Sequence, residues 1–249
     1  MDAKMEAVVD AKMEALVDRR RVMILRVCGA AIVLAALVVG AGQAAAQPKE
    51  LPATVATLTG KAEMYKKGDT KWNPADLRNQ LNEGDGLRTG PSVRATLRTA
   101  GGHAIRLAAL GQAFLVAPPQ GAPEPQPVRV RLDRGWLWVA VTPGIHAQAP
   151  IEVIAGPARV AVRDGGIGFR LHRDGSVLVR TYHGLAVVRG SDPSASWERS
   201  LPEQAEVLVP PSGPPAENRT ITRELAENSW LLWNEEQDYV AYGGKAPQR

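Results

Sequence analysis

The residues that could support catalysis or bind a metal are scattered along the chain rather than clustered. The 249 residues include four histidines and one cysteine. No histidine has a second histidine or a carboxylate at the spacing that places two metal ligands on one helical face, as in His-Glu-x-x-His. We therefore predict no metal site. The histidines are His103, His146, His172 and His183.

His172 and Asp174 combine an acid and a base on the two sides of a predicted turn, Arg173-Asp174-Gly175. We interpret them as a satisfied surface pair rather than as a ligand pair. A hydrolase built from scattered aspartate and histidine residues is the enzymatic alternative. Changes at His172 and Asp174 that left every activity intact would count against that alternative.

Motifs for nucleophilic catalysis or phosphate binding are missing from the sequence. Gly-x-Ser-x-Gly and a paired-carboxylate signature are absent. The glycine-rich stretch 165–168 lies between predicted strands without a following helix, so it cannot use a helix N-terminus to hold a phosphate. Cys28 lies in an apolar segment that we expect to be removed, which excludes disulfides, thiol catalysis and cysteine-zinc sites. We predict a protein that is not an enzyme and has no cofactor.

The N-terminal residues predict export. Residues 27–39 are apolar apart from glycine, follow a basic cluster that ends at Arg26, and precede small residues suited to cleavage after Ala46. Thirteen apolar residues are too few to span a bilayer comfortably, since about 20 are needed. We predict a signal peptide and a periplasmic protein; an uncleaved anchor in the inner membrane, its one link to a membrane, is the alternative.

Charge gives little sign of a nucleic-acid partner. The chain has 30 basic and 26 acidic residues, a formal charge of +4. Basic runs interleaved with aromatic residues, the usual mark of nucleic-acid binding, are missing. The run Arg19-Arg20-Arg21 belongs to the export signal. We therefore expect no nucleic-acid partner.

Alternation of apolar and polar residues predicts short β-strands throughout residues 47–209. In residues 93–99, Val93, Ala95 and Leu97 should be buried, while the residues between them face water. Gly101-Gly102 should turn this strand into the next, residues 103–107. We also predict turns at 133–135, 164–166 and 173–175. The proline-rich stretch 118–127 is interpreted as an exposed loop within the domain.

Strands at spacings of about 8 to 12 residues are typical of all-β folds. We predict a β-sandwich, jelly-roll-like and with glycine-rich hairpins, followed by one C-terminal amphipathic helix. The expected divisions are residues 1–46 for the signal peptide or anchor, 47–209 for the β domain, 210–217 for a proline-rich linker, and 218–249 for the helix and tail.

The C-terminal residues change to a helical period. Ala226, Trp230, Trp233 and Val240 recur at helix spacing, with Leu225 and Leu232 on an adjoining stripe. We expect this apolar stripe to pack on the sandwich, although binding to a partner or a membrane surface is an alternative. The opposite, exposed side is expected to be acidic, through Glu224, Glu227, Glu235, Glu236 and Asp238.

The stretch 84–107 resembles the FecR-type domain. That family's pattern is Gly-Asp, then Thr-Gly, an alternating strand, a glycine turn and an apolar-x-Leu strand, and each part occurs here in this order. The resemblance extends over roughly residues 51–209, although 165–168 replaces the family's Gly-Thr step. The family-motif residues, expected to be structural, are Gly84, Asp85, Thr89, Gly102, Leu107, Gly135, Arg163, Phe169, Gly175 and Gly184.

The resemblance implies a periplasmic, all-β, non-catalytic module. In the best-known members a cytoplasmic anti-sigma segment precedes the membrane span, and the periplasmic part senses an outer-membrane transporter. About 21 residues precede the apolar segment here, fewer than the roughly 40 that a domain usually needs. The expected role is that of the sensing part alone.

The expected partner is an envelope protein, bound in sensing, signalling or assembly. Because tryptophan and arginine carry most binding hot spots, exposed tryptophans are the candidate contacts. The alternative is a carbohydrate-binding module for peptidoglycan or exopolysaccharide, with Trp136 and Trp138 stacking sugars from one strand face. The candidate binding residues are Trp72, Trp136, Trp138, Trp230 and Trp233.

Overall fold

The computed structural model describes residues 53–121, 126–142, 150–191, 197–221 and 229–242. All of them belong to one compact unit, Glu50–Arg249. The predicted signal segment, His146, Leu225, Ala226, Glu224 and Glu227 lie outside the described residues. Within the described ranges, no helix has the length and apolar character needed to cross a bilayer.

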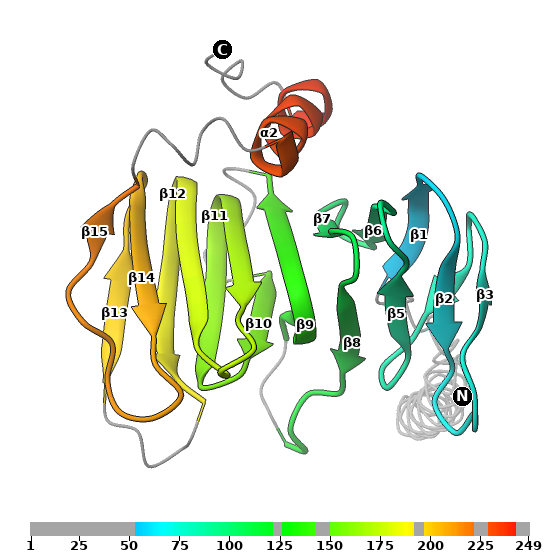
Figure 1. Ribbon diagram of the computed structural model, residues 1–249, viewed down its shortest axis with the longest axis horizontal. Helices are drawn as coiled ribbons and strands as arrows, with labels where there is room; N and C mark the ends of the chain where they lie inside the picture. Colours follow the sequence, from blue (N-terminus) through cyan, green and yellow to red (C-terminus); the bar gives the residue numbers. More distant parts are fainter. Residues whose placement is uncertain (1–52, 122–125, 143–149, 192–196, 222–228, 243–249) are drawn as a thin grey trace, which may run out of the picture. The chain divides into compact units, whose positions relative to one another are not determined.

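The prediction of an all-β fold with one C-terminal helix is confirmed. Fifteen strands join one large sheet, and a single helix follows them in the described part of the chain (Figure 1). The elements are β1 (Ala53–Leu58), β2 (Ala62–Tyr65), β3 (Asn73–Ala75), β4 (Gln80–Leu81), β5 (Gly86–Thr89), β6 (Ala95–Thr99), β7 (Ala104–Leu107), β8 (Gln112–Val116), β9 (Val128–Val141), β10 (Ile151–Ala155), β11 (Ala158–Leu171), β12 (Val177–Gly190), β13 (Glu198–Leu201), β14 (Ala205–Val209), β15 (Arg219–Thr220) and α2 (Ser229–Tyr242).

Three long strands connect two layers of the sheet. The first half of β9 pairs with β8 and β10, whereas its second half pairs with β7 and β11. Strand β12 likewise pairs with β14 through its first half and with β13 through its second. The first layer is β3-β2-β5-β8-β9-β10-β11-β12-β13, and the second is β4-β1-β6-β7-β9-β11-β12-β14-β15. The two sandwich layers are therefore parts of one continuous sheet.

The predicted turns at 133–135 and 164–166 are wrong, because both segments are bulges inside long strands. The register of β11 against β12 shifts on each side of Asp164–Gly166, where Gly165 lies opposite Gly184. Both glycines have positive φ, and a Cβ on Gly165 would lie 2.0 Å from the carbonyl oxygen of His183. Strand β9 has its register shift at the corresponding place, near Gly135. These bulges let one strand serve both layers.

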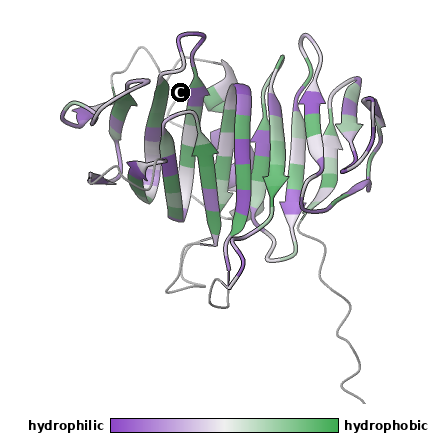
Figure 2. Ribbon diagram, turned by 90° about the horizontal axis from the view of Figure 1, so that it is seen from below, coloured by the Kyte–Doolittle hydropathy of each residue, from purple (hydrophilic) through white to green (hydrophobic). Residues whose placement is uncertain are grey.

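Apolar and polar residues alternate along several strands (Figure 2), and the apolar ones fill the core between the layers. Val93, Ala95 and Leu97 are buried, and β6 and β7 form the predicted hairpin across Gly101-Gly102. The expectation that the residues between the three face water is wrong for Thr96, which is buried and whose Oγ1 accepts a hydrogen bond from Thr57 Oγ1 at 2.7 Å. Leu115 and Val130 of the first layer share one apolar cluster with Leu137 and Val139 of the second. A smaller apolar cluster lies on the other side of the second layer, where α2 packs.

Helix α2 packs on the sheet, as expected, but with a different face. Trp230, Leu231 and Asn234 are buried, whereas Val240 is exposed. Asp238 and Glu235, expected on the exposed side, also face the sheet, and only Glu236 of the three described carboxylates is exposed. The helix therefore docks through a face that is apolar at its start and polar towards its end.

Candidate functional site

The Gly84-Asp85 motif is a structural hub. Asp85 is buried and accepts hydrogen bonds from Lys66 Nζ at 2.7 Å, from the Lys67 backbone at 2.8 Å and from the Asn82 backbone at 2.8 Å. Burial alone would raise the pKa of Asp85, but these hydrogen bonds hold it below its ordinary value. The carboxylate thus joins the β2–β3 connection to the approach to β5.

The other motif residues also hold the fold. Thr89 Oγ1 donates to the carbonyl of Ala108 and accepts from the Gly111 backbone at 2.9 Å, tying β5 to the loop before β8. Leu107 and Phe169 are in the core. Arg163 is the exception, because it is exposed beside the β11 bulge. The motif glycines with positive φ are Gly84, Gly102, Gly135, Gly175 and Gly184.

Trp72 belongs to an aromatic cluster on the outside of the first layer. Its ring centroid lies 5.7 Å from those of Tyr65 and Phe114, and Arg88 lies 4.6 Å from the Trp72 centroid. All four side chains are half-buried. The cluster packs its rings against one another at tilted angles, so it presents no flat platform.

The other four candidate tryptophans meet on the outside of the second layer. Trp136 and Trp138 come from β9, while Trp230 and Trp233 come from α2, about 100 residues later in the chain. Trp138 is 1% exposed, stacks on Tyr182 at 4.9 Å and is covered by the helix. Trp230 is buried as well, and stacks on Trp233 at 5.4 Å. Of the four, only Trp136 and Trp233 are accessible.

The pair predicted to stack sugars is therefore divided between two roles. Trp138 anchors α2, and only Trp136 of the two can meet a ligand while the helix is docked. The sequence left open whether Trp136 and Trp138 or Leu137 and Val139 are buried. Leu137 and Val139 fill the core between the layers, and Trp138 is buried under the helix.

A buried ion pair fixes the polar end of α2. Arg106 Nη1 of β7 donates to Asp238 Oδ1 at 2.5 Å, and Trp138 Nε1 donates to Asp238 Oδ2 at 2.9 Å. The side chains of Arg106 and Asp238 are only 2% and 14% exposed. Asn234 Oδ1 lies 3.4 Å from the same Arg106 nitrogen. One carboxylate thus joins the helix to two strands.

Burial dominates the electrostatics at this docking face. It raises the pKa of Asp238, although Arg106 and Trp138 act in the opposite direction. It likewise raises the pKa of Glu235, whose Oε1 lies 4.0 Å from His183 Nε2, a neighbour that opposes the shift. Tyr182 also has a raised pKa, because burial outweighs its interaction with Arg180. These groups serve helix docking.

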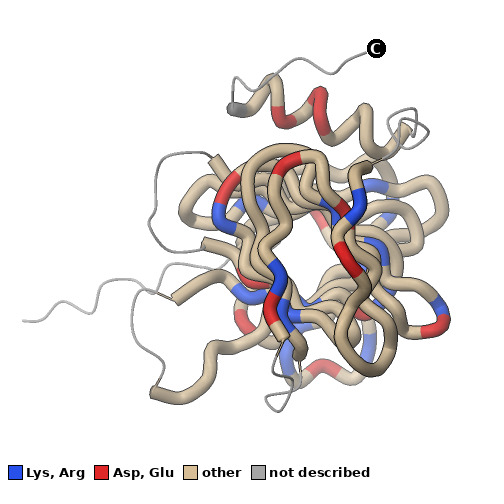
Figure 3. The backbone as a smooth tube through the Cα atoms, turned by 90° about the vertical axis from the view of Figure 1, so that its left-hand side faces the viewer, with Lys and Arg blue, Asp and Glu red and all other residues tan. Residues whose placement is uncertain are grey.

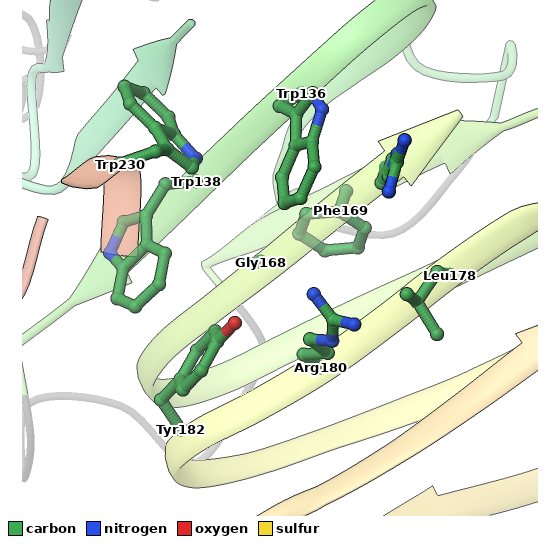
Figure 4. Close-up of a pocket in the computed structure, with 9 residues that line it drawn as sticks. Trp136, Trp138, Gly168, Phe169, Leu178, Arg180, Tyr182 and Trp230 are labelled. Atoms are coloured by element: carbon green, nitrogen blue, oxygen red, sulfur yellow. The ribbon is translucent and has the colours of Figure 1, made fainter. Parts of the chain in front are cut away.

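A shallow, open pocket lies where α2 begins (Figure 4). Trp230 of the helix lines it on one side, and Trp136, Arg170, Leu178 and Arg180 of the sheet line it on the other. Arg180 forms an ion pair with Glu206, in which Arg180 Nε donates to Glu206 Oε2 at 2.9 Å. Arg170 is exposed, and its guanidinium carbon lies 4.7 Å from the Trp136 ring centroid.

The sheet continues beyond the pocket as a row of side chains that are exposed or half-buried. The ladders place Arg170 opposite both Trp136 and Leu178, and Leu178 opposite Leu208, so all four point to the same side. Leu208 is 51% exposed. The register that forms this row was not visible in the sequence. We call Trp136 of β9, Arg170 of β11, Leu178 of β12 and Leu208 of β14 the outer row.

The predicted His172–Asp174 pair does not form a hydrogen bond in the structure. Asp174 Oδ1 accepts from the Ser176 backbone at 2.9 Å and from Ser176 Oγ at 2.7 Å, which lowers the pKa of Asp174. The predicted turn at 173–175 is present between β11 and β12, with Gly175 at φ 85. In the described ranges, no three His, Cys, Asp or Glu residues group in a way that could hold a metal ion.

Comparison with known proteins gives a structural likeness only. No model of a protein family and no curated protein matches the chain. The chain is similar to two crystal structures of a "putative anti-sigma factor" from Parabacteroides distasonis ATCC 8503, at 1.65 and 2.50 Å resolution, each with a TM-score of 0.45 and 13% identity. The matches cover 59% and 64% of this chain, and 64% and 75% of the other chains. A likeness at this level carries no argument about function, so the FecR-type relationship stays a resemblance.

Proposed function

We propose that this protein is an exported, non-catalytic FecR-like module that binds a protein partner in the periplasm through the outer row. The observation that supports this proposal most directly is the exposed or half-buried row of Trp136, Arg170, Leu178 and Leu208 beside the docked helix. Its role is sensing, signalling or assembly in the cell envelope.

The outer row has the composition of a protein-binding surface. It crosses four neighbouring strands, a span of about 14 Å at the usual strand spacing. Tryptophan and arginine dominate binding hot spots, and hot spots lie in partly formed pockets from which a partner excludes water. Trp136 and Arg170 line such a pocket. Two leucines extend the apolar contact away from it.

The structure changes which tryptophans are suited to contact a partner. Trp138 and Trp230 are buried under or within the docked helix, so their replacement would disturb the fold before it disturbed binding. Trp136 is half-buried and Leu208 is mostly exposed. The two residues that best report on binding are therefore Trp136 and Leu208.

Replacing Leu208 with serine is expected to reduce recovery of the envelope partner about tenfold, because the exposed apolar side chain at the β14 end of the outer row is no longer there for the partner to bury. Trp136→Ala should act in the same direction. The measurement is affinity capture from envelope extract with the tagged full-length chain, read by quantitative mass spectrometry. Leu77→Ser is the matched control, since Leu77 is 58% exposed outside the outer row.

Thermal unfolding separates binding from folding in this experiment. Leu208→Ser and Leu77→Ser should both change the melting temperature little, because both side chains are exposed. Equal recovery of the partner by wild type and Leu208→Ser would contradict the proposed contact surface. Recovery of peptidoglycan or exopolysaccharide alone, without an enriched protein, would support the carbohydrate-binding module instead.

A further inference from the structure

The contacts of helix α2 show which kinds of side chain bind to the outer face of the second layer. The helix sequence contains three carboxylates, three large aromatic residues besides Tyr242 and no lysine or arginine (Figure 3). It docks against arginine and histidine side chains of the sheet. The interface therefore pairs an acidic, aromatic segment with a basic, aromatic sheet face.

Three contacts carry this complementarity. Asp238 pairs with Arg106 at 2.5 Å, and Glu235 lies 4.0 Å from His183. Arg94 lies over the Trp233 ring, with 5.0 Å between its guanidinium carbon and the ring centroid. The carboxylates and tryptophans of one helix thus meet cations that come from separate strands and loops.

The outer row continues the same chemistry with side chains that are exposed or half-buried. Trp230 of α2 lines one pocket together with Trp136, Arg170 and Leu178, so the docked helix and the outer row adjoin. Arg170 has the Trp136 ring as its neighbour, and no carboxylate in the described ranges lies within ion-pair distance of it. Arg170 therefore lacks the anionic partner that Arg106 finds in α2.

The charged groups near Arg170 are His172, Asp174 and Arg180. Besides burial, the charges of Arg170 and Arg180 lower the pKa of His172, while Asp174 opposes them. Arg180 is already paired with Glu206. Arg170 is the exposed cation in this group whose charge is left for a ligand.

We propose that the outer row binds an acidic segment of a partner polypeptide, docked beside α2, with a carboxylate on Arg170 and an apolar side chain packed against Trp136, Leu178 and Leu208. This inference rests on the proposed function and names its partner's chemistry. An acidic glycan would satisfy Arg170 and Trp136, but it offers little to Leu178 and Leu208, which favour an apolar side chain.

The probe for this inference is a random 12-residue peptide library displayed on phage and selected on the full-length chain. Selected peptides should contain aspartate or glutamate close to an aromatic or aliphatic residue. Their binding should weaken when sodium chloride rises from about 50 to 500 mM, because salt screens an exposed ion pair.

Reversing the charge at the outer row should then remove binding of the selected peptides. Arg170→Glu is expected to weaken the affinity at least about tenfold, because a like charge replaces the pairing cation. Arg199→Glu is the matched control, since Arg199 is an exposed arginine on β13, outside the outer row. It should bind the peptides as the wild type does.

Several outcomes would overturn the inference. These are selected peptides without an excess of carboxylates, equal affinity for wild type and Arg170→Glu, or no enrichment of any peptide. Binding of polygalacturonate that is lost in Arg170→Glu, with no peptide bound, would assign the row to an acidic glycan. If the selected peptides were neutral or basic and Leu208→Ser abolished their binding, the inference of an acidic partner would be wrong, while the proposed function would stand.

Discussion

Replacing Asp238 with alanine is expected to lower the free energy of unfolding by about 3 kcal/mol, in the range measured when one member of a buried ion pair is removed. Arg106 would be left buried and unpaired, since its side chain is 2% exposed. Trp138 Nε1 would lose its acceptor at the same time. The protein can limit this cost by releasing α2, which would return Arg106 to water.

Urea unfolding followed by tryptophan fluorescence measures both responses, because Trp138, Trp230 and Trp233 all lie at the helix–sheet interface. Release of α2 should appear as a separate early transition in Asp238→Ala. Glu236→Ala is the control, since Glu236 is the exposed carboxylate of the same helix. The double variant Arg106→Met/Asp238→Leu should recover most of the loss, because it leaves no buried charge. A loss below about 1 kcal/mol in Asp238→Ala would contradict the role given to this pair.

Local alternation was enough to predict the strands and the burial of Val93, Ala95 and Leu97, but not the burial of Thr96 and Arg106. The alternation can be read within a single strand, so the burial of Val93, Ala95 and Leu97 could be predicted without knowing which strand pairs with them. The hairpin between β6 and β7 followed from the glycine pair between two such runs. The class of fold, all-β with a terminal helix, could therefore be predicted from the sequence.

The bulges were mistaken for turns because turns and bulges use the same local signal. A glycine with positive φ suits a tight turn as well as a bulge. Gly165 and Gly184 lie opposite each other in the β11–β12 ladder, and only this pairing shows that the chain continues along the strand instead of reversing. Pairing across about 20 residues is a tertiary property, so a turn was predicted at 164–166, where β11 continues.

The docking face of α2 was missed because its buried positions are partly polar. An apolar stripe identifies the buried face of a helix only if the polar residues stay in water. A polar residue can be buried as well when the sheet offers it a charged partner. Asp238 is buried because Arg106, 132 residues earlier in the chain, meets it. Residue types did identify the tryptophans around this face. The outer row depends on strand register, which residue types do not give.

Replacing Asp85 with alanine is expected to cost about 3 kcal/mol of folding free energy, because hydrogen bonds to a charged group are worth about 1.5–3 kcal/mol each and Lys66, Lys67 and Asn82 all lose this acceptor. Asp85→Asn should cost about 2 kcal/mol, since one amide oxygen remains as an acceptor. The amide nitrogen of that variant would face either Lys67 N–H or Asn82 N–H, which are themselves donors. Urea unfolding at pH 7 measures both losses, with Asp76→Asn, an exposed turn residue, as the control.

The pH dependence gives this prediction a second, independent test. The pKa of Asp85 is lowered in the folded protein, so its contribution to stability is present above the unfolded-state pKa of about 4 and is lost as the pH falls through the lower folded value. The difference in unfolding free energy between wild type and Asp85→Asn should therefore narrow steadily below about pH 4. A difference that stays constant down to about pH 2 would mean that the loss in Asp85→Asn comes from altered packing, because a charge that stabilises the fold must lose its effect once it is protonated.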